Sequence, residues 1–136
     1  MKYTFLLFAL LTFSLTSNAQ KTAFDLKASI TAGQEIYTIN CQSCHMEQGE
    51  GLEGVYPPLA KSDYLMADKK RSIKQIIGGI SGAIIVNGTE YNSEMSGYPF
   101  SDEEISQVLN YIRNSFGNKA PAVTPAEVAA ERKLLK

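Results

Sequence analysis

Apolar residues in the first third of the chain recur at three- and four-residue spacing up to the first cysteine. This spacing is typical of one buried face of a helix. It predicts a helix that begins at Ser29 or Thr31, either of which can cap it, and that runs to about Asn40. The positions on this face are Ile30, Gly33, Ile36, Tyr37 and Cys41.

A second stripe, made of isoleucines, predicts a helix over residues 68–78, with a shorter helical turn over residues 62–66 before it. Residues 83–86 and 89–92 then flank the dipeptide Asn87-Gly88, which is the strongest short-range signal for a hairpin turn. We therefore expect a small β-hairpin within residues 83–92. The isoleucines of the stripe are Ile73, Ile76, Ile77 and Ile80.

The C-terminal third carries two signals for the start of a helix. Ser101 and Glu104 have the spacing of a capping box, and the apolar face that follows predicts a helix that ends at Gly117. After a linker, Thr124 and the proline behind it indicate one more short helix. The apolar face of the first of these helices consists of Ile105, Val108, Leu109 and Ile112.

Together these elements predict a small all-α fold of three to five helices with a minor hairpin. A chain of 136 residues has room for one domain. We place this domain at residues 29–117, after a lead-in at residues 20–28 and before a C-terminal tail at residues 118–136.

The N-terminus has the layout of a secretory signal peptide over residues 1–19. Lys2 precedes a nearly continuous apolar run over residues 3–15, and Ser17 and Ala19 occupy the positions expected before a cleavage site. This layout predicts export to the bacterial periplasm. Cleavage after Ala19 would leave no segment that is apolar and long enough to span a bilayer. Without cleavage, the same run would tether the protein to a membrane.

Both cysteines and the only histidine fall in one string, Cys41-Gln42-Ser43-Cys44-His45. A disulfide between cysteines this close would constrain the unfolded chain little. A thioredoxin-like pair belongs in a βαβ unit, which the pattern lacks, and a structural zinc ion needs four ligands where the string offers three.

The same string spells the attachment signal for a c-type haem, Cys-x-x-Cys-His. Two thiols at this spacing reach the two vinyl groups on one edge of a haem and form thioethers. The histidine that follows then projects under the macrocycle and binds the iron. We therefore predict one covalently attached haem c, with Cys41 and Cys44 as its thioether residues and His45 as an iron ligand.

With this string at the end of a helix, the sequence resembles a class I cytochrome c of the small bacterial kind over about residues 31–117. The resemblance implies a few α-helices around one haem, with a methionine ligand in a loop before the last helix. Met95 lies at that position and is the predicted second iron ligand. Met66 remains an alternative, whereas Met46 is adjacent to His45 and cannot reach the opposite haem face.

Pro57 lies twelve residues after His45, with Leu59 two further on. This resembles the Pro-x-Leu segment of the family, whose proline carbonyl accepts a hydrogen bond from the ligating imidazole. The neighbouring Pro58 would shift that assignment by one residue. The sequence also resembles the family at the contact between its first and last helices, through Gly33, Tyr37, Val108 and Tyr111.

If both iron ligands come from the chain, substrate cannot bind the metal, so we expect an electron carrier and not an enzyme. Its partners would be redox proteins such as an oxidase, a reductase or a dehydrogenase. The alternative is a haem enzyme subunit or a gas-binding sensor with a displaceable sixth ligand. Rapid, complete binding of carbon monoxide by the reduced protein would favour that alternative.

The charge pattern predicts little about docking. With 13 basic and 14 acidic residues and no basic tract, the chain is a poor candidate for binding nucleic acid. We expect its two charged clusters to be ordinary solvated surface, and electron transfer to depend only modestly on salt. The acidic cluster is Glu47, Glu50 and Glu53, and the basic one is Lys69, Lys70, Arg71 and Lys74.

Overall fold

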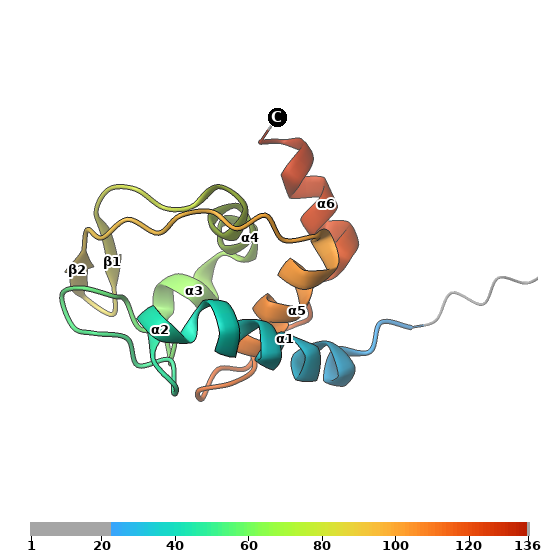
Figure 1. Cartoon of the computed structure of the whole chain (residues 1–136), viewed down its shortest axis with the longest axis horizontal. Coiled ribbons are helices and arrows are strands. Elements are labelled where there is room, and N and C mark those ends of the chain that lie inside the picture. Colours follow the sequence, from blue (N-terminus) through green and yellow to red (C-terminus); the bar gives the residue numbers. More distant parts are fainter. Residues whose placement is uncertain (1–22, 136) are drawn as a thin grey trace, which may run out of the picture.

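The computed structural model describes residues 23–135, so the predicted signal peptide at residues 1–19 lies outside the described residues. Within them the chain forms six helices and one two-stranded hairpin, in agreement with the predicted mostly helical fold (Figure 1). The number of helices exceeds the expected range because the cysteine–histidine string forms a short helix of its own. The elements are α1 (Leu26–Asn40), α2 (Gln42–His45), α3 (Asp63–Ala67), α4 (Lys69–Gly78), β1 (Ile84–Val86), β2 (Thr89–Tyr91), α5 (Asp102–Ile112) and α6 (Pro125–Lys133).

Helix α1 begins a turn earlier than the sequence predicted. Asp25 caps it, and its carboxylate accepts a hydrogen bond from a first-turn amide at 3.0 Å. Ser29 does not act as a cap because it is buried and its hydroxyl accepts a hydrogen bond from the Asn110 side-chain amide at 2.9 Å. The expected start at Ser29 or Thr31 is therefore wrong, and the end of the lead-in is helical.

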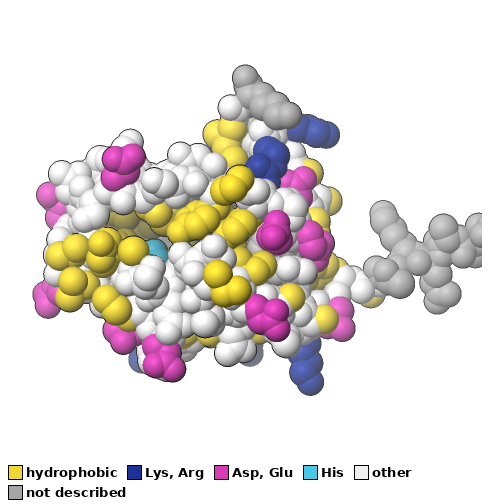
Figure 2. Space-filling view, viewed as in Figure 1, with side chains coloured by type: hydrophobic (Ala, Val, Ile, Leu, Met, Phe, Trp, Pro, Cys, Tyr) yellow, Lys and Arg dark blue, Asp and Glu magenta, His cyan; other side chains and the backbone are white. Residues whose placement is uncertain are grey.

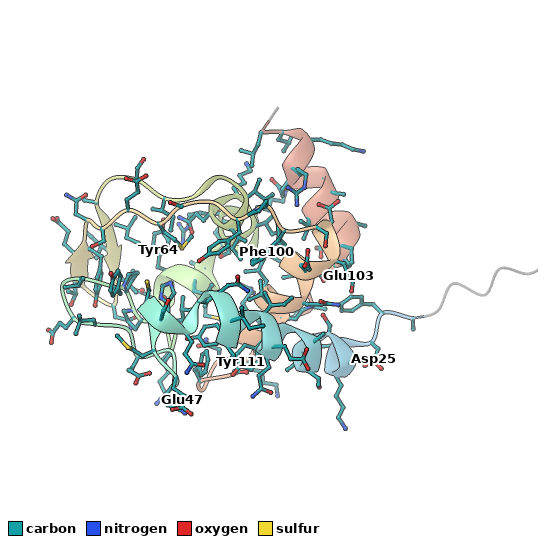
Figure 3. All side chains as sticks on the ribbon, viewed as in Figure 1. Asp25, Glu47, Tyr64, Phe100, Glu103 and Tyr111 are labelled. Carbon is teal, nitrogen blue, oxygen red and sulfur yellow. The ribbon has the colours of Figure 1, made fainter. Side chains whose placement is uncertain are left out.

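Helices α1 and α5 cross closely at the centre of the fold (Figures 1 and 3). At the crossing point, a Cβ added to Gly33 would overlap the carbonyl oxygen of Gln107 on α5. Beside it, the rings of Tyr37 and Tyr111 lie with their centroids 5.4 Å apart, and Val108 is fully buried. The contact that the resemblance implied between the first helix and a late helix is therefore present.

The predicted turn, second helix and hairpin are all confirmed. Ser62 and Asp68 cap α3 and α4 through their side-chain oxygens. Ile73 from the isoleucine stripe is fully buried in the core. Strands β1 and β2 pair antiparallel across Asn87-Gly88, and this hairpin closes one end of the molecule (Figure 1).

Helix α5 begins at the predicted capping box but ends earlier than predicted, at Ile112. Ser101 and Glu104 exchange both hydrogen bonds of the box. The side-chain amide of Asn118 donates a hydrogen bond to the Ile112 carbonyl at 2.7 Å, which satisfies the end of the helix there. Gly117 has a positive φ of 81° but lies in the turn beyond the helix, so the expected end at Gly117 is wrong.

The tail forms α6, as the sequence predicted, and α6 packs against α4 and α5. Val123 and Val128 are fully buried and belong to the same core cluster as the residues of α1 and α5. The side-chain ammonium of Lys69 on α4 lies 2.5 Å from the carboxylate of Glu127 on α6. The tail therefore contributes to the core of the folded protein.

Candidate functional site

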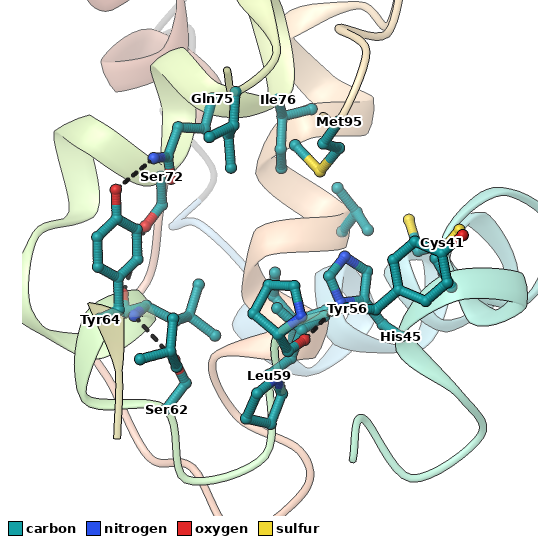
Figure 4. Close-up of a pocket in the computed structure, with 18 of the residues that line it drawn as sticks. Cys41, His45, Tyr56, Leu59, Ser62, Tyr64, Ser72, Gln75, Ile76 and Met95 are labelled. Carbon is teal, nitrogen blue, oxygen red and sulfur yellow. Dashed lines mark hydrogen bonds between the residues drawn. The ribbon is translucent and has the colours of Figure 1, made fainter. Parts of the chain in front are cut away.

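The cysteine–histidine string follows α1 directly and turns the chain toward a cavity inside the molecule. Cys41 ends α1 and precedes α2, and its carbonyl accepts hydrogen bonds from the amides of Cys44 at 3.2 Å and His45 at 3.0 Å. This single helical turn brings both thiols and the imidazole to the same cavity, which all three side chains line (Figure 4).

The imidazole of His45 is held by the loop that follows α2. Its Nδ1 atom lies 2.9 Å from the carbonyl oxygen of Pro57, a distance at which a protonated Nδ1 donates a hydrogen bond. Such a bond leaves Nε2 without a proton. Burial lowers the pKa of His45, and the hydrogen bond to Pro57 offsets this only in part, so the ring is neutral near pH 7. A neutral imidazole with an unprotonated nitrogen can bind a metal.

A tight loop positions the carbonyl of Pro57. Leu52 and Tyr56 exchange two backbone hydrogen bonds, of 2.8 and 2.7 Å, and the amide of Gly51 donates to the carbonyl of His45 at 3.0 Å. Gly51 has a φ of 65°, and a Cβ there would press on the backbone of Tyr56 and Pro57. Glycine is therefore required at this position to bring the loop back against the imidazole.

Met95 reaches the cavity from the segment between β2 and α5. Its backbone pairs with that of Ile80, just after α4, through two hydrogen bonds of 2.8 and 3.0 Å. Gly79 and Gly97 flank this pairing, and a Cβ at either glycine would collide with backbone of the opposite segment. The pairing fixes the segment so that the Met95 thioether points into the cavity (Figure 4).

The two other methionines among the described residues do not line this cavity. Met46 follows His45 with a φ of 64°, and its carbonyl accepts a hydrogen bond from the Tyr37 hydroxyl at 2.6 Å. Met66 is half-buried within α3. Of the methionines considered from the sequence, the structure brings Met95 to the cavity of His45 and leaves Met46 and Met66 outside it.

The cavity has a volume of about 310 Å³, within the range of about 300–1,000 Å³ that is usual for cofactor and small-molecule sites. Its polar end lies opposite Cys41 and carries Ser72, Gln75 and Tyr64, where the Gln75 amide donates to the Tyr64 hydroxyl at 2.7 Å (Figure 4). The remaining wall is mostly apolar. It includes Leu65, Ile76, Val108, Leu109 and Ile112.

Among the residues that the structure describes, Cys41 lacks the lowered pKa of a reactive thiol and the pair of cysteines lacks the further ligands of a zinc site. Both are free thiols. Burial raises the pKa of Cys41 to about 11, and the neighbouring Cys44 adds to this shift, whereas a reactive dithiol needs a lowered pKa. Within residues 23–135, no group of three or more cysteine, histidine and acidic side chains is arranged to hold a metal ion.

The residues present do fit a c-type haem. Two thiols stand at one end of an apolar cavity, and an unprotonated imidazole nitrogen and a thioether enter it from different elements. Histidine and methionine are the axial donors of cytochromes c, and an apolar wall suits the macrocycle. The geometry therefore matches the donor set of such a group.

Comparison with known proteins decides the family. The family model for cytochrome c matches residues 30–116 of the chain. The chain belongs to the cytochrome c family. As a class I cytochrome c it transfers electrons and is not an enzyme, as the sequence predicted, and the family implies covalently bound haem c.

Several relatives are similar over most of this chain. Two cytochromes c-552 of Thermus thermophilus are 34% identical over 126 residues, which cover 76% of this chain and 95% and 84% of the relatives. The cytochrome c subunit of a quinone alcohol dehydrogenase from Gluconobacter oxydans is 34% identical over 99 residues, which cover 70% of this chain and 20% of that subunit. The cytochrome c subunit of gluconate 2-dehydrogenase from Pantoea cypripedii is 30% identical over 105 residues, which cover 74% of this chain and 24% of that subunit.

Tyr98 lines the cavity, although no signal in the sequence points to it. The hydroxyl of Tyr98 donates to the carbonyl of Asn40 at 2.8 Å and so ties the Met95 segment to the end of α1. Only the fold brings these positions together, because 58 residues separate them in the chain.

In the part of the chain that the structure describes, no helix is apolar and long enough to cross a membrane.

Proposed function

We propose that this cytochrome carries one electron at a time between redox partner proteins and holds a single haem. Cys41 and Cys44 would attach the haem as thioethers, and His45 and Met95 would bind its iron. The observation that supports this proposal is that one cavity is lined by all four side chains.

When bound, the haem supplies an iron that cycles between the ferric and ferrous states. The chain's own part is to keep the ligands in place in both states. The carbonyl of Pro57, 2.9 Å from Nδ1, fixes the orientation of the His45 ring and its tautomer. The pairing of Met95 with Ile80 holds the thioether, and a thioether donor favours the reduced state.

We further propose that the protein is exported to the periplasm after cleavage behind Ala19. The layout of residues 1–19 supports this. A dehydrogenase is one partner that fits, since similar proteins include cytochrome c subunits of dehydrogenases. An oxidase or a reductase would exchange electrons with the same haem. The intact mass of the exported protein tests the cleavage site and the number of haems, with the expected result of a chain from Gln20 that carries one haem.

An optical spectrum with a redox titration of the exported protein tests the haem and its ligands together. We expect a c-type spectrum, one single-electron wave and little binding of carbon monoxide to the reduced protein. A protein without covalent haem would refute the proposal. Rapid and complete carbon monoxide binding would instead indicate an open site, as in a haem enzyme or a gas sensor.

A further inference from the structure

Two segments that supply many of the residues lining the cavity contain acidic residues and no lysine or arginine. Of these acidic residues, Glu94 lines the cavity itself, and the others lie on the same two segments. Residues 41–60 hold the cysteine–histidine string and the Pro57 loop, and residues 75–101 hold the hairpin and Met95. All the acidic residues of these segments are exposed, and none forms an ion pair with another described residue. They are Glu47, Glu50, Glu53, Glu90 and Glu94.

The lysines of α4 form ion pairs with glutamates of α6 and with none of these five. Lys69 lies 2.5 Å from Glu127, and Lys74 lies 3.4 Å from Glu131. The guanidinium of Arg71 stacks on a tyrosine ring, 3.7 Å from its centroid. Glu127 and Glu131 of α6 therefore offset two of the four positive charges of α4.

Figure 2 shows the resulting surface. Apolar side chains border the hollow where the histidine is visible, and acidic side chains lie farther out along the edge of this end of the molecule. The lysines and arginines in view lie mainly toward α6 and the start of α1. Leu52 and Val55, on the Pro57 loop, are 49% and 40% exposed. An apolar surface with a charged rim is the usual composition of a transient protein interface.

We propose that this acidic mouth, the five glutamates with Leu52 and Val55, docks a redox protein that carries a basic rim around its own redox centre. The inference rests on the proposed function, because docking there brings a partner to the cavity of Cys44 and His45. Opposed charges would speed the encounter, and the apolar centre would exclude water at the contact. The modest salt dependence expected from the sequence then gives way to a strong one.

Two small redox probes of opposite charge test the sign of the field. Hexaammineruthenium(II) gives one electron to the ferric protein, and hexacyanoferrate(III) takes one from the ferrous protein. Between ionic strengths of about 0.01 and 0.15 M, we expect the rate with the cation to fall by about threefold and the rate with the anion to rise. Equal or inverted salt responses would overturn the proposal.

A matched pair of variants locates the field. Glu53→Gln removes one negative charge from the acidic mouth. Glu103→Gln removes one negative charge at the start of α5, far from Glu47 and α2 (Figure 3). We expect Glu53→Gln to lower the rate with the cation by about 1.5-fold at low salt, and Glu53→Gln/Glu90→Gln to lower it further. An equal effect of Glu103→Gln would show that only net charge matters and would overturn the proposal.

A protein probe tests the docking itself. Titration of the isotope-labelled cytochrome with a lysine-ringed cytochrome c should shift the amide resonances of residues 47–56 and 88–95, and added salt should reverse the shifts. Shifts confined to α4 and α6 would refute the acidic mouth. These outcomes require a haem-loaded, redox-active protein, so a protein without a c-type spectrum would refute the proposed function instead.

Discussion

At the scale of single residues, His45 and Met95 are held by different means. His45 is fixed through its side chain, by the Pro57 carbonyl, whereas Met95 is fixed through its backbone, by the pairing with Ile80. Within residues 23–135, no hydrogen bond orients the thioether itself. The methionine is therefore the donor that a substitution can remove with the least disturbance to the cavity.

Met95→Leu keeps the volume of the side chain but removes the sulfur donor. We expect the haem to remain attached, the potential to fall by on the order of 100 mV, and the reduced protein to bind carbon monoxide rapidly. Redox titration and carbon monoxide spectra measure these effects. The matched control, Met66→Leu, lies outside the cavity and should leave both unchanged; the reverse pattern would assign the ligand to Met66.

The residues of this cavity could be selected from the sequence because they are scarce and chemically distinctive. The spacing of Cys41, Cys44 and His45 indicates haem attachment, and the resemblance to the family points to Met95, which lies before a capped helix. Tyr98 and Gln75 could not be selected, since tyrosine and glutamine are common and only the fold brings them to the cavity.

At the scale of elements, the crossing of α1 and α5 depends on the missing side chain of Gly33. A Cβ there would overlap the Gln107 carbonyl, which belongs to a helix and cannot move alone. We expect Gly33→Ala to lower the free energy of unfolding of the haem-loaded protein by about 3 kcal/mol, as measured by chemical denaturation.

Gly78→Ala is the matched control for this prediction. Gly78 also lies in a helix, but a Cβ there would meet nothing within 4 Å. The alanine should leave stability unchanged or raise it by up to about 1 kcal/mol. If both variants had the same stability, the close crossing would not be the reason for glycine at position 33.

Local signals predicted the elements well and their ends less well. The sequence correctly predicts the helix caps at Ser101 and Thr124, because each cap forms hydrogen bonds with a residue only three positions further along the chain. Ser29 failed as a cap because a distant partner, Asn110, takes its hydroxyl, and Gly117 failed as a helix end because the Asn118 side chain closes the helix earlier. These side-chain hydrogen bonds, which span 81 residues for Ser29 and six for Asn118, leave no periodic trace in a sequence.

At the scale of the whole molecule, the apolar side chains of the core surround the cavity that we assign to the haem. Most residues that line the cavity from α4 and α5 are apolar, so an empty cavity would expose them to water. Ligand binding stabilises only the folded state, and a haem that fills this cavity does so through a large apolar contact. Folding and attachment are therefore expected to be coupled.

The double variant Cys41→Ser/Cys44→Ser tests this coupling, because it prevents covalent attachment. We expect the haem-free protein to lose helical circular dichroism and to melt without a cooperative transition. Addition of haem to the same variant serves as the control and should restore part of the helical signal. A haem-free protein that melts cooperatively at the temperature of the native one would contradict the expectation.

The tail gives the molecule an acid-sensitive contact. Burial raises the pKa of Glu127, but hydrogen bonds from Lys69 and Thr124 outweigh it, and the net pKa lies below the ordinary value of 4.5. A carboxylate with a lowered pKa stabilises the fold above its unfolded pKa, and this contribution is lost as the pH falls through the folded pKa.

Glu127→Gln keeps the capping box of α6 but removes the charge. We expect the variant to be less stable than the native protein by up to about 1 kcal/mol at pH 7, since the ion pair is partly exposed. The difference should decrease as the pH falls below 4.5, through the lowered pKa of Glu127. Thermal unfolding at pH 7 and in acid measures it, with the exposed Glu103→Gln as control. A difference that persists in acid would mean that α6 is held by the packing of Val128 and not by the charge of Glu127.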